Sequence, residues 1–481
     1  MSTTADLAML GLSNASLTDV ELRTVRQLKL AAEMEILRLN GDIEKLLKQK
    51  WDLLNTVNQC NVALAHHKRL PLEVLRSIIA FAASEPARIP VVNEGVYAMS
   101  QVCSTWRQLI LETPELWSNI SLDFRRCSSE EADKKIRTAR EWLSRAQNRP
   151  VSFTINGAEY DVVKKLVEHY PCRALDLSVS YWHTNAQQPQ PLGNTSLAAL
   201  ETLDLRGSSL PKFLGEGFSL PVLKSLSVNE IEDLNVIHSV ASQLHYLRIR
   251  CPTSRSQVLD LMRLCVQLED CELNIAPDAK NSKSPKSESK RRAVVIPSLR
   301  ELKLTFHKGA NAPSFLQYLK FSNLSSLSLL VESGTDSSPL DPPTISSLIA
   351  RSDGMPRLQS LTIGEMKEPF DLKALLLDTP SLRQLDIKQG VLDADCMDQL
   401  SRGDLGAQLR HLTSRHAHEA EAVLRMVESR HQNATTCQLN VIAPFSSVRV
   451  NGVAADTSAS LALRDRIRKL RSLGIVVALS I

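Results

Sequence analysis

Apolar residues recur every seven positions along residues 17–65. With Leu22 at heptad position a, the d positions and most a positions are apolar, and only Lys29 and Lys50 interrupt the seam. Gly41 costs about 1 kcal/mol relative to alanine inside a helix. The other a positions are Ile36, Ile43, Val57 and Leu64, and the d positions are Val25, Ala32, Leu39, Leu46, Leu53 and Cys60. The pattern predicts a long amphipathic helix that either self-associates as a coiled coil or folds back on its own chain.

A second apolar stretch, residues 66–122, has the pattern of a small helical module. Pro71 suits the first turn of a helix, where its missing N–H needs no partner. A further helix is predicted over residues 96–111, and Pro114 ends it because the residue before proline avoids helical geometry. The first helix carries an apolar stripe at three- and four-residue spacing, formed by Val74, Leu75, Ile78 and Ile79. A linking helix and strand are expected over residues 123–155.

From residue 171 onward the motif L-x-x-L-x-L recurs at intervals of 21 to 34 residues. Its two-residue leucine spacing predicts one short strand per repeat, stable only when repeats stack. The copies begin at Cys172, Leu200, Leu223, Leu244, Leu268, Leu299, Leu324, Leu358, Leu382 and Leu409. Leucine-rich repeats usually place Asn or Cys three residues after the third leucine, and these repeats do not. We therefore expect an irregular solenoid over residues 156–456, with helices of variable length on its convex side.

The fold class is therefore α plus α/β: a coiled-coil-like helix, a small helical module and a repeat solenoid. Residues 1–16 and the loop 277–293 are small, polar or charged, and we expect both to be disordered. Within the loop, Lys290–Arg292 is either a solvated basic run or a nuclear import signal. Residues 457–481 are expected to form a helix and a strand that cap the last repeat.

Composition excludes several classes of protein. A net charge of +4 is mild for 481 residues, so nucleic-acid binding is not expected. No apolar run approaches the roughly 20 residues that cross a bilayer, and the N-terminus lacks a signal-peptide pattern. We expect a cytoplasmic or nuclear protein, or one found in both compartments. The nine cysteines form no CxxC pair, so reduced thiols are expected in place of a zinc or disulfide framework.

No catalytic, cofactor-binding or metal-binding residues are predicted. The sequence contains no phosphate-binding loop, zinc-protease motif or nucleophile elbow. His411, His416 and His418 cluster on a stretch that has the pattern of an exposed helical face, without neighbouring ligand cysteines. We therefore expect a binding protein and not an enzyme.

The helical module resembles an F-box. The pattern LPxEVLxxI…VCxxWRxLI…TPxLWxxI fixes about a dozen positions over about 50 residues, beginning at Leu70 and closing at Pro114 and Trp117. It is most similar to the F-box proteins abundant in mushroom-forming fungi. In those proteins a helical segment precedes the box, and a W-L-x-R-x-x-x-R-P helix follows it. Here that motif begins at Trp142 and ends at Pro150. The resemblance covers roughly residues 20–155, and the remainder only by architecture.

The resemblance implies a substrate-recognition subunit of an SCF-type (Skp–cullin–F-box) E3 ubiquitin ligase. Such a subunit binds the Skp-type adaptor, and through it a cullin. The adaptor-facing residues would be Leu70, Pro71, Val74, Leu75 and Ile78. The core of the box would be formed by Val102, Trp106, Ile110 and Trp117. Two alternatives remain: an F-box adaptor that acts outside the ligase, and a coiled-coil and repeat scaffold without a ubiquitin role.

The repeats would present a protein substrate with the strand positions that lie between the leucines. These positions are Glu201, Thr202, Asp204, Lys224, Ser225, Ser227, His245, Tyr246, Arg248, Arg300, Glu301, Lys303, Arg383, Gln384 and Asp386. They are mixed in sign, so they do not define a single class of substrate.

Overall fold

The computed structural model divides into two compact units, Met1–Phe81 and Ala82–Ile481. It describes residues 16–64, 70–89, 95–178, 197–209, 219–231, 234–277, 293–332, 340–366, 368–414, 420–436, 442–451 and 460–480. Most of the two segments expected to be disordered, together with Lys290–Arg292, His416 and His418, lie outside the described residues.

The first unit contains the predicted long helix, α2 (Asp19–Leu64), which extends over 46 residues. Thr18 caps its start: the backbone N–H of Thr18 donates to the Glu21 carboxylate at 2.9 Å, and the N–H of Glu21 donates to the Thr18 hydroxyl at 3.4 Å. Over Asp19–Leu64 no residue is buried. The second helix of this unit, α3 (Leu72–Ala82), begins directly after Pro71.

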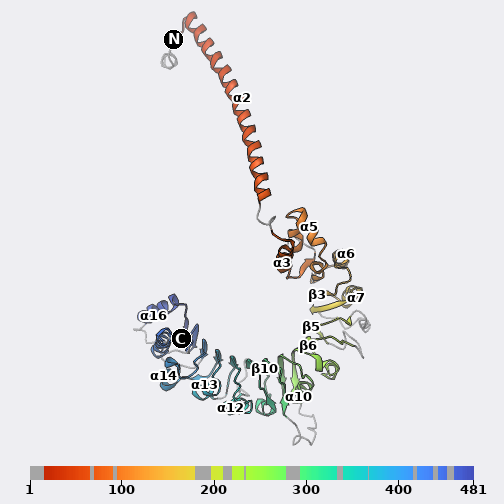
Figure 1. Ribbon diagram of the computed structural model, residues 1–481, viewed down its shortest axis with the longest axis vertical. Coiled ribbons are helices and arrows are strands. Elements are labelled where there is room, and N and C mark those ends of the chain that lie inside the picture. The colour runs from red at the N-terminus through yellow and green to blue at the C-terminus, as the bar shows by residue number, and fades with distance from the viewer. Residues whose placement is uncertain are drawn as a thin grey trace. The chain divides into compact units, whose positions relative to one another are not determined.

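The second unit is a solenoid built on one parallel sheet. Within the described residues, fifteen strands pair in chain order, each parallel to the next. The strands are β1 (Ala87–Ile89), β2 (Asn119–Asp123), β3 (Val151–Asn156), β4 (Cys172–Ser178), β5 (Thr202–Ser209), β6 (Ser225–Glu230), β7 (Tyr246–Ser254), β8 (Asp270–Ala276), β10 (Glu301–Phe306), β12 (Ser326–Val331), β13 (Ser360–Ile363), β15 (Gln384–Ile387), β17 (His411–Ser414), β18 (Ser447–Asn451) and β19 (Val476–Ser480). Within this unit the strands line the inner side of an arc, and the helices cover its outer side (Figure 1).

The helices of this unit vary in length, as expected for an irregular solenoid. They are α4 (Gly95–Ser100), α5 (Ser104–Leu111), α6 (Ser129–Leu143), α7 (Tyr160–Val167), α10 (Arg255–Leu264), α11 (Ala312–Leu316), α12 (Pro342–Arg351), α13 (Leu372–Asp378), α14 (Ala394–Arg402), α15 (Ala420–Thr436) and α16 (Ser460–Ser472). Two short sheets accompany them, one of β9 (Val294–Val295) with β11 (Leu319–Lys320) and one of β14 (Phe370–Asp371) with β16 (Gly390–Val391). None of the helices in the described ranges is both long and apolar enough to span a membrane.

Each of the ten predicted repeat copies contributes a strand, β4 through β17. The register places equivalent leucines side by side, for example Leu203 beside Leu226 and Leu247 beside Cys271. These side chains are fully buried, whereas the residues between them are partly exposed, apart from the buried Ser227. The repeat leucines therefore form a continuous core beneath the sheet, and the intervening residues face the inner side.

Side-chain caps begin several of the outer helices. Asn311, Asp341, Asp371 and Asp393 each accept a hydrogen bond from a backbone N–H in the first turn of α11, α12, α13 and α14, at 2.6 to 3.0 Å. Such caps satisfy helix N–H groups that have no intrahelical partner. In repeats that lack the usual asparagine, these caps provide acceptors for some of the backbone N–H groups that follow the strands.

The structure differs from the sequence expectations at both ends of the solenoid. The sheet does not start with the repeats at residue 156 but already includes β1, β2 and β3. The single helix expected over residues 96–111 is two helices, because the chain turns after Ser100 and Cys103 is fully extended, with φ −160° and ψ 173°. At the other end, the expected terminal helix and strand are α16 and β19, and β19 continues the same sheet beside the unpredicted strand β18.

Candidate functional site

The first candidate surface is the exposed side of α3 and the residues that lead into it. Pro71 is exposed, and Leu70, Val74 and Ile78 are 37%, 44% and 42% exposed. Leu72 and Phe81 are also exposed, at 49% and 84%. Large apolar side chains gathered on so short a segment form the kind of patch that marks interaction sites.

A neighbouring side of α3 is buried. Leu75 is 2% exposed and Ile79 is 1% exposed. Their four-residue spacing puts both on one face of the helix, away from Val74 and Ile78. Leu75 was predicted to face the adaptor, but its burial removes its side chain from the candidate surface. We therefore define the α3 surface as Leu70, Pro71, Val74 and Ile78.

In the second unit, the residues that match the closing part of the F-box pattern pack around Trp117, in the turn Pro114–Trp117. The indole N–H of Trp117 donates to the carbonyl of Ile110 at 2.9 Å, and both side chains are buried. Trp142 of α6 lies 4.6 Å from Trp117 between ring centroids, and the guanidinium of Arg145 lies 4.7 Å from the Trp117 ring. The W-L-x-R helix thus packs directly on the closing turn of the F-box-like segment.

Two other predicted core residues are placed differently. Val102 is 52% exposed, because it lies in the turn between α4 and α5 and not inside a helix. The N–H of Val102 donates to the carbonyl of Met99 at 3.2 Å, which closes that turn. Trp106 is only partly buried. Val102 is therefore not part of the core.

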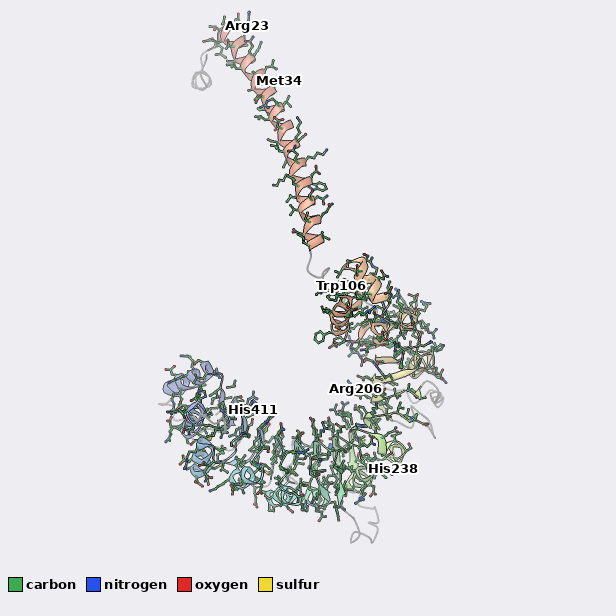
Figure 2. The ribbon with its side chains drawn as sticks, viewed as in Figure 1. Arg23, Met34, Trp106, Arg206, His238 and His411 are labelled. Carbon is green, nitrogen blue, oxygen red and sulfur yellow. The ribbon has the colours of Figure 1, made fainter. Side chains whose placement is uncertain are left out.

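The second candidate surface is the inner face of the solenoid. Its central row contains one residue from each strand, side by side in the sheet register. From β4 to β10 the row is Asp176, Asp204, Ser227, Arg248, Glu272 and Lys303. Figure 2 shows Arg206 and His411 on this inner side and His238 on the outer side of the second unit. Charged side chains therefore follow one another along the inner face.

At one end of this row, Arg206 forms ion pairs with two carboxylates. Its Nη2 atom lies 3.1 Å from Asp176 Oδ2 and 3.2 Å from Asp204 Oδ2. Burial raises the pKa of Asp176, and the charge of Arg206 opposes this shift. The Oδ1 atoms of both aspartates and the hydroxyl of Ser227, which is only 4% exposed, have no hydrogen-bond partner. These three acceptors are buried, so at this end of the row the ion pairs of Arg206 are the partly exposed polar feature.

At the other end, Glu272 pairs with two cations. Lys303 Nζ lies 2.7 Å from Glu272 Oε1, and Arg248 forms an ion pair with the other carboxylate oxygen. Partial burial raises the pKa of Glu272, but the hydrogen bond and charge of Lys303 and the charge of Arg248 outweigh it, so its pKa lies below the usual value. The guanidinium of Arg248 also lies 5.3 Å from the centroid of Tyr246. These contacts order the side chains that a partner would meet.

A hollow of about 530 Å³ lies beside the residues that directly precede β10 to β17. Three arginines line it, Arg300, Arg357 and Arg383, together with Glu269. Its other lining residues are polar or small, among them Asn323, Ser325, Gln359 and Ser381. The excess of cationic side chains in this hollow suits an acidic segment of a partner.

Sequence reasoning named many residues of the inner face but missed several. Asp176 and Glu272 occupy the same register position as the predicted Asp204 and Lys303, so extending the repeat pattern to every copy would have found them. Arg206 and Arg357 lie just outside the motif positions that were considered. Only the three-dimensional arrangement brings them to the row and to the hollow.

Among the described residues, no group of three or more His, Cys, Asp or Glu side chains could hold a metal ion. His411, which was expected on a helical face, is instead the first residue of strand β17 and is exposed. The other two histidines of that cluster lie outside the described residues.

Comparison with known proteins gives only a distant structural similarity. No protein-family model matches the chain, and no curated protein matches it. Among solved structures, the chain is similar to a crystal structure of the mouse RP105/MD-1 complex, with a TM-score of 0.33 and 12% sequence identity. The match covers 74% of this chain and 69% of that chain.

Proposed function

We propose that this protein is the substrate-recognition subunit of an SCF-type ubiquitin ligase. In this proposal the α3 surface binds a Skp-type adaptor, and the inner face of the solenoid binds a protein substrate. The protein makes no bond itself but raises the concentration of the substrate near the ubiquitin-transferring partner.

The observation that carries the proposal is the division of apolar residues on α3. Leu75 and Ile79 are buried on one side of the helix. Val74 and Ile78 lie on another side and remain more than 40% exposed. Exposed aliphatic side chains on one helix fit a groove on a partner, and a few such residues supply most of the binding energy in many interfaces. They occupy the positions that the F-box pattern assigns to the adaptor.

The packing around Trp117 supports the same proposal. Residues of the F-box-like pattern and of the motif that follows it, Ile110, Trp117, Trp142 and Arg145, converge in one cluster. Their spacing in the sequence thus corresponds to contacts in the fold. The inner face, with its ordered and partly exposed ion pairs, supports a binding role for the repeats.

Reconstitution with purified adaptor and cullin tests the proposal. The full chain should retain the cullin only when the adaptor is present. Replacing Val74→Glu and Ile78→Glu together should abolish retention, because two carboxylates would be placed in an apolar groove. The matched control is Leu377→Glu on α13, where a 61% exposed leucine receives the same change. Failure of the native chain to bind the adaptor would contradict the proposal.

The same reconstitution separates the ligase from the adaptor that acts outside it. A chain that binds the adaptor but does not retain the cullin would favour the non-ligase alternative. A chain that binds neither protein would favour a coiled-coil and repeat scaffold.

A further inference from the structure

Helix α2 carries an apolar seam that nothing in its own unit covers. The heptad residues Ile36, Leu39, Ile43, Leu46 and Leu53 are between 46% and 67% exposed. No residue of Asp19–Leu64 is buried. Fully burying one aliphatic side chain stabilises a protein by about 1.5 to 3 kcal/mol relative to leaving it in water. An exposed seam of this length therefore leaves a large favourable free energy of burial unused.

The residue types in the seam select two parallel strands. Position a holds Ile36 and Ile43, and position d of the same heptads holds Leu39 and Leu46. β-Branched residues at a combined with leucine at d favour parallel dimers over trimers or tetramers. The central part of α2 follows this rule in these two successive heptads.

The two lysines in the seam point to the same stoichiometry. Lys29 and Lys50 occupy position a. At the edge of a two-stranded seam a lysine can keep its ammonium group in water while its methylene groups pack. In the more enclosed core of a trimer or tetramer, the lysine ammonium group reaches water less easily. Polar residues at isolated a positions also fix register, at a cost in stability.

The charges beside the seam favour the parallel orientation. In a parallel pair, each g position faces position e of the following heptad on the other helix, which brings Glu21 beside Arg26. Glu21 and Arg26 carry opposite charges, and no g–e pair combines like charges. In an antiparallel pair, g faces g, and the charged residues at g are all acidic: Glu21, Glu35 and Asp42. The antiparallel arrangement therefore gains no attraction from them.

We propose that two copies of this chain associate through α2 as a parallel, in-register coiled coil. At 1.5 Å per residue, the 46-residue helix gives an interface about 70 Å long. The inference is independent of adaptor binding, since it rests only on α2. Its consequence is that each assembly carries two copies of the α3 surface and two solenoids. A partner with two recognition segments would then bind both copies with raised effective concentration.

Light scattering on the full-length protein tests the stoichiometry. The native chain should have twice the monomer mass of 53.4 kDa. Replacing Ile36→Glu and Ile43→Glu should halve the measured mass, because four carboxylates would face one another in the seam. The matched control is Met34→Glu with Leu37→Glu, since these residues lie outside the seam and are 62% and 67% exposed. The control should remain dimeric, and circular dichroism should show the same helix content for the control as for the native chain.

Cross-linking at Cys60 tests the orientation. Cys60 is an exposed free thiol at position d. A parallel, in-register pair places it opposite its own copy, so mild oxidation should cross-link the native chain and not Cys60→Ser. A monomeric native chain, a mass of three or more chains, or a seam variant that stays dimeric would overturn the proposal. A dimer that does not cross-link through Cys60 would overturn the parallel register.

Discussion

The guanidinium group of Arg430 stacks on the ring of Phe445, with 4.6 Å between its central carbon and the ring centroid. Arg430 is fully buried, and burial lowers its pKa to about 10. Its nitrogen atoms donate hydrogen bonds of 2.7 to 3.2 Å to the carbonyl groups of Leu400, Gly406, Ala407, Leu409 and Ala443. One side chain thus joins α15 to the end of α14, the turn before β17 and the segment before β18.

Replacing Arg430→Lys should destabilise the C-terminal part of the solenoid. An ammonium group has three donors and no planar fork, so it cannot satisfy all five carbonyl groups or stack on Phe445 in the same way. Leaving buried acceptors unpaired costs about 1 to 3 kcal/mol each. We expect the free energy of unfolding to fall by about 3 kcal/mol, measured by hydrogen exchange of the amides in β17 and β18.

Arg425→Lys on the same helix is the control for this change. Arg425 is 67% exposed, and its ion pair with Glu421 is long, at 3.8 Å. Exposed pairs of this kind contribute about 0 to 1 kcal/mol, so the control should exchange like the native chain. Equal hydrogen exchange of the β17 and β18 amides in the Arg430→Lys and Arg425→Lys proteins would contradict this prediction. It would show that the buried guanidinium does not stabilise the C-terminal part of the solenoid.

Replacing Gly41→Ala should strengthen α2. A Cβ atom at Gly41 would meet nothing within 4 Å, and alanine is favoured over glycine in a helix by about 1 kcal/mol. Hydrogen exchange of the amides around residue 41 should slow by about fivefold, since 1.4 kcal/mol corresponds to tenfold. Unchanged or faster exchange would mean that Gly41 has a role in the helix other than its poor propensity.

Thiol labelling should separate Cys60 from the cysteines of the solenoid core. Burial raises the pKa of Cys172, Cys265 and Cys396 to about 12, whereas Cys60 is exposed. Thiolates are the reactive form, so in the Ile36→Glu, Ile43→Glu variant, whose seam is expected to be open, an alkylating reagent at pH 8 should modify Cys60 first and the three buried thiols only after unfolding. Rapid modification of the buried three in the folded protein would contradict the packing described for the repeats.

The same thiols give the solenoid a dependence on alkaline pH. An ordinary cysteine has a pKa near 9, and these three are raised in the folded state. The stability that they contribute is complete below pH 9 and is lost as the pH rises from about 9 toward 12, because the unfolded chain then releases protons more readily. Replacing all three by alanine or valine should flatten the loss of stability over that range. An equally steep loss in the variant would assign the effect to other groups.

The repeats could be predicted because their leucines are both regular and buried. Strand β18 was not predicted from the sequence, because Phe445, Val448 and Val450 occupy the positions at which other repeats have leucine. Strand β2 follows the turn that ends at Trp117 without any repeat motif, and only its pairing with β3 defines it. In both cases the position in the sheet, and not the motif, determines the structure.

The binding residues were harder to predict for a different reason. Helical spacing groups Val74, Leu75 and Ile78 as apolar, but it does not tell which side of α3 is covered. The burial of Leu75 and the exposure of Val102 depend on packing and on a turn that the pattern does not encode. Arg430 shows the same limit, because its five acceptors come from segments that lie 13 to 30 residues away.

The affinity of a Skp-type adaptor for the full-length chain tests the central claim most directly. It should be measured by titration calorimetry for the native protein and for the double change Leu70→Ala with Pro71→Ala. The account predicts binding by the native chain and a loss of affinity of about tenfold or more in the variant, with unchanged helix content, because two side chains of the α3 surface are removed. No binding by the native chain, or equal affinity in the variant, would contradict it.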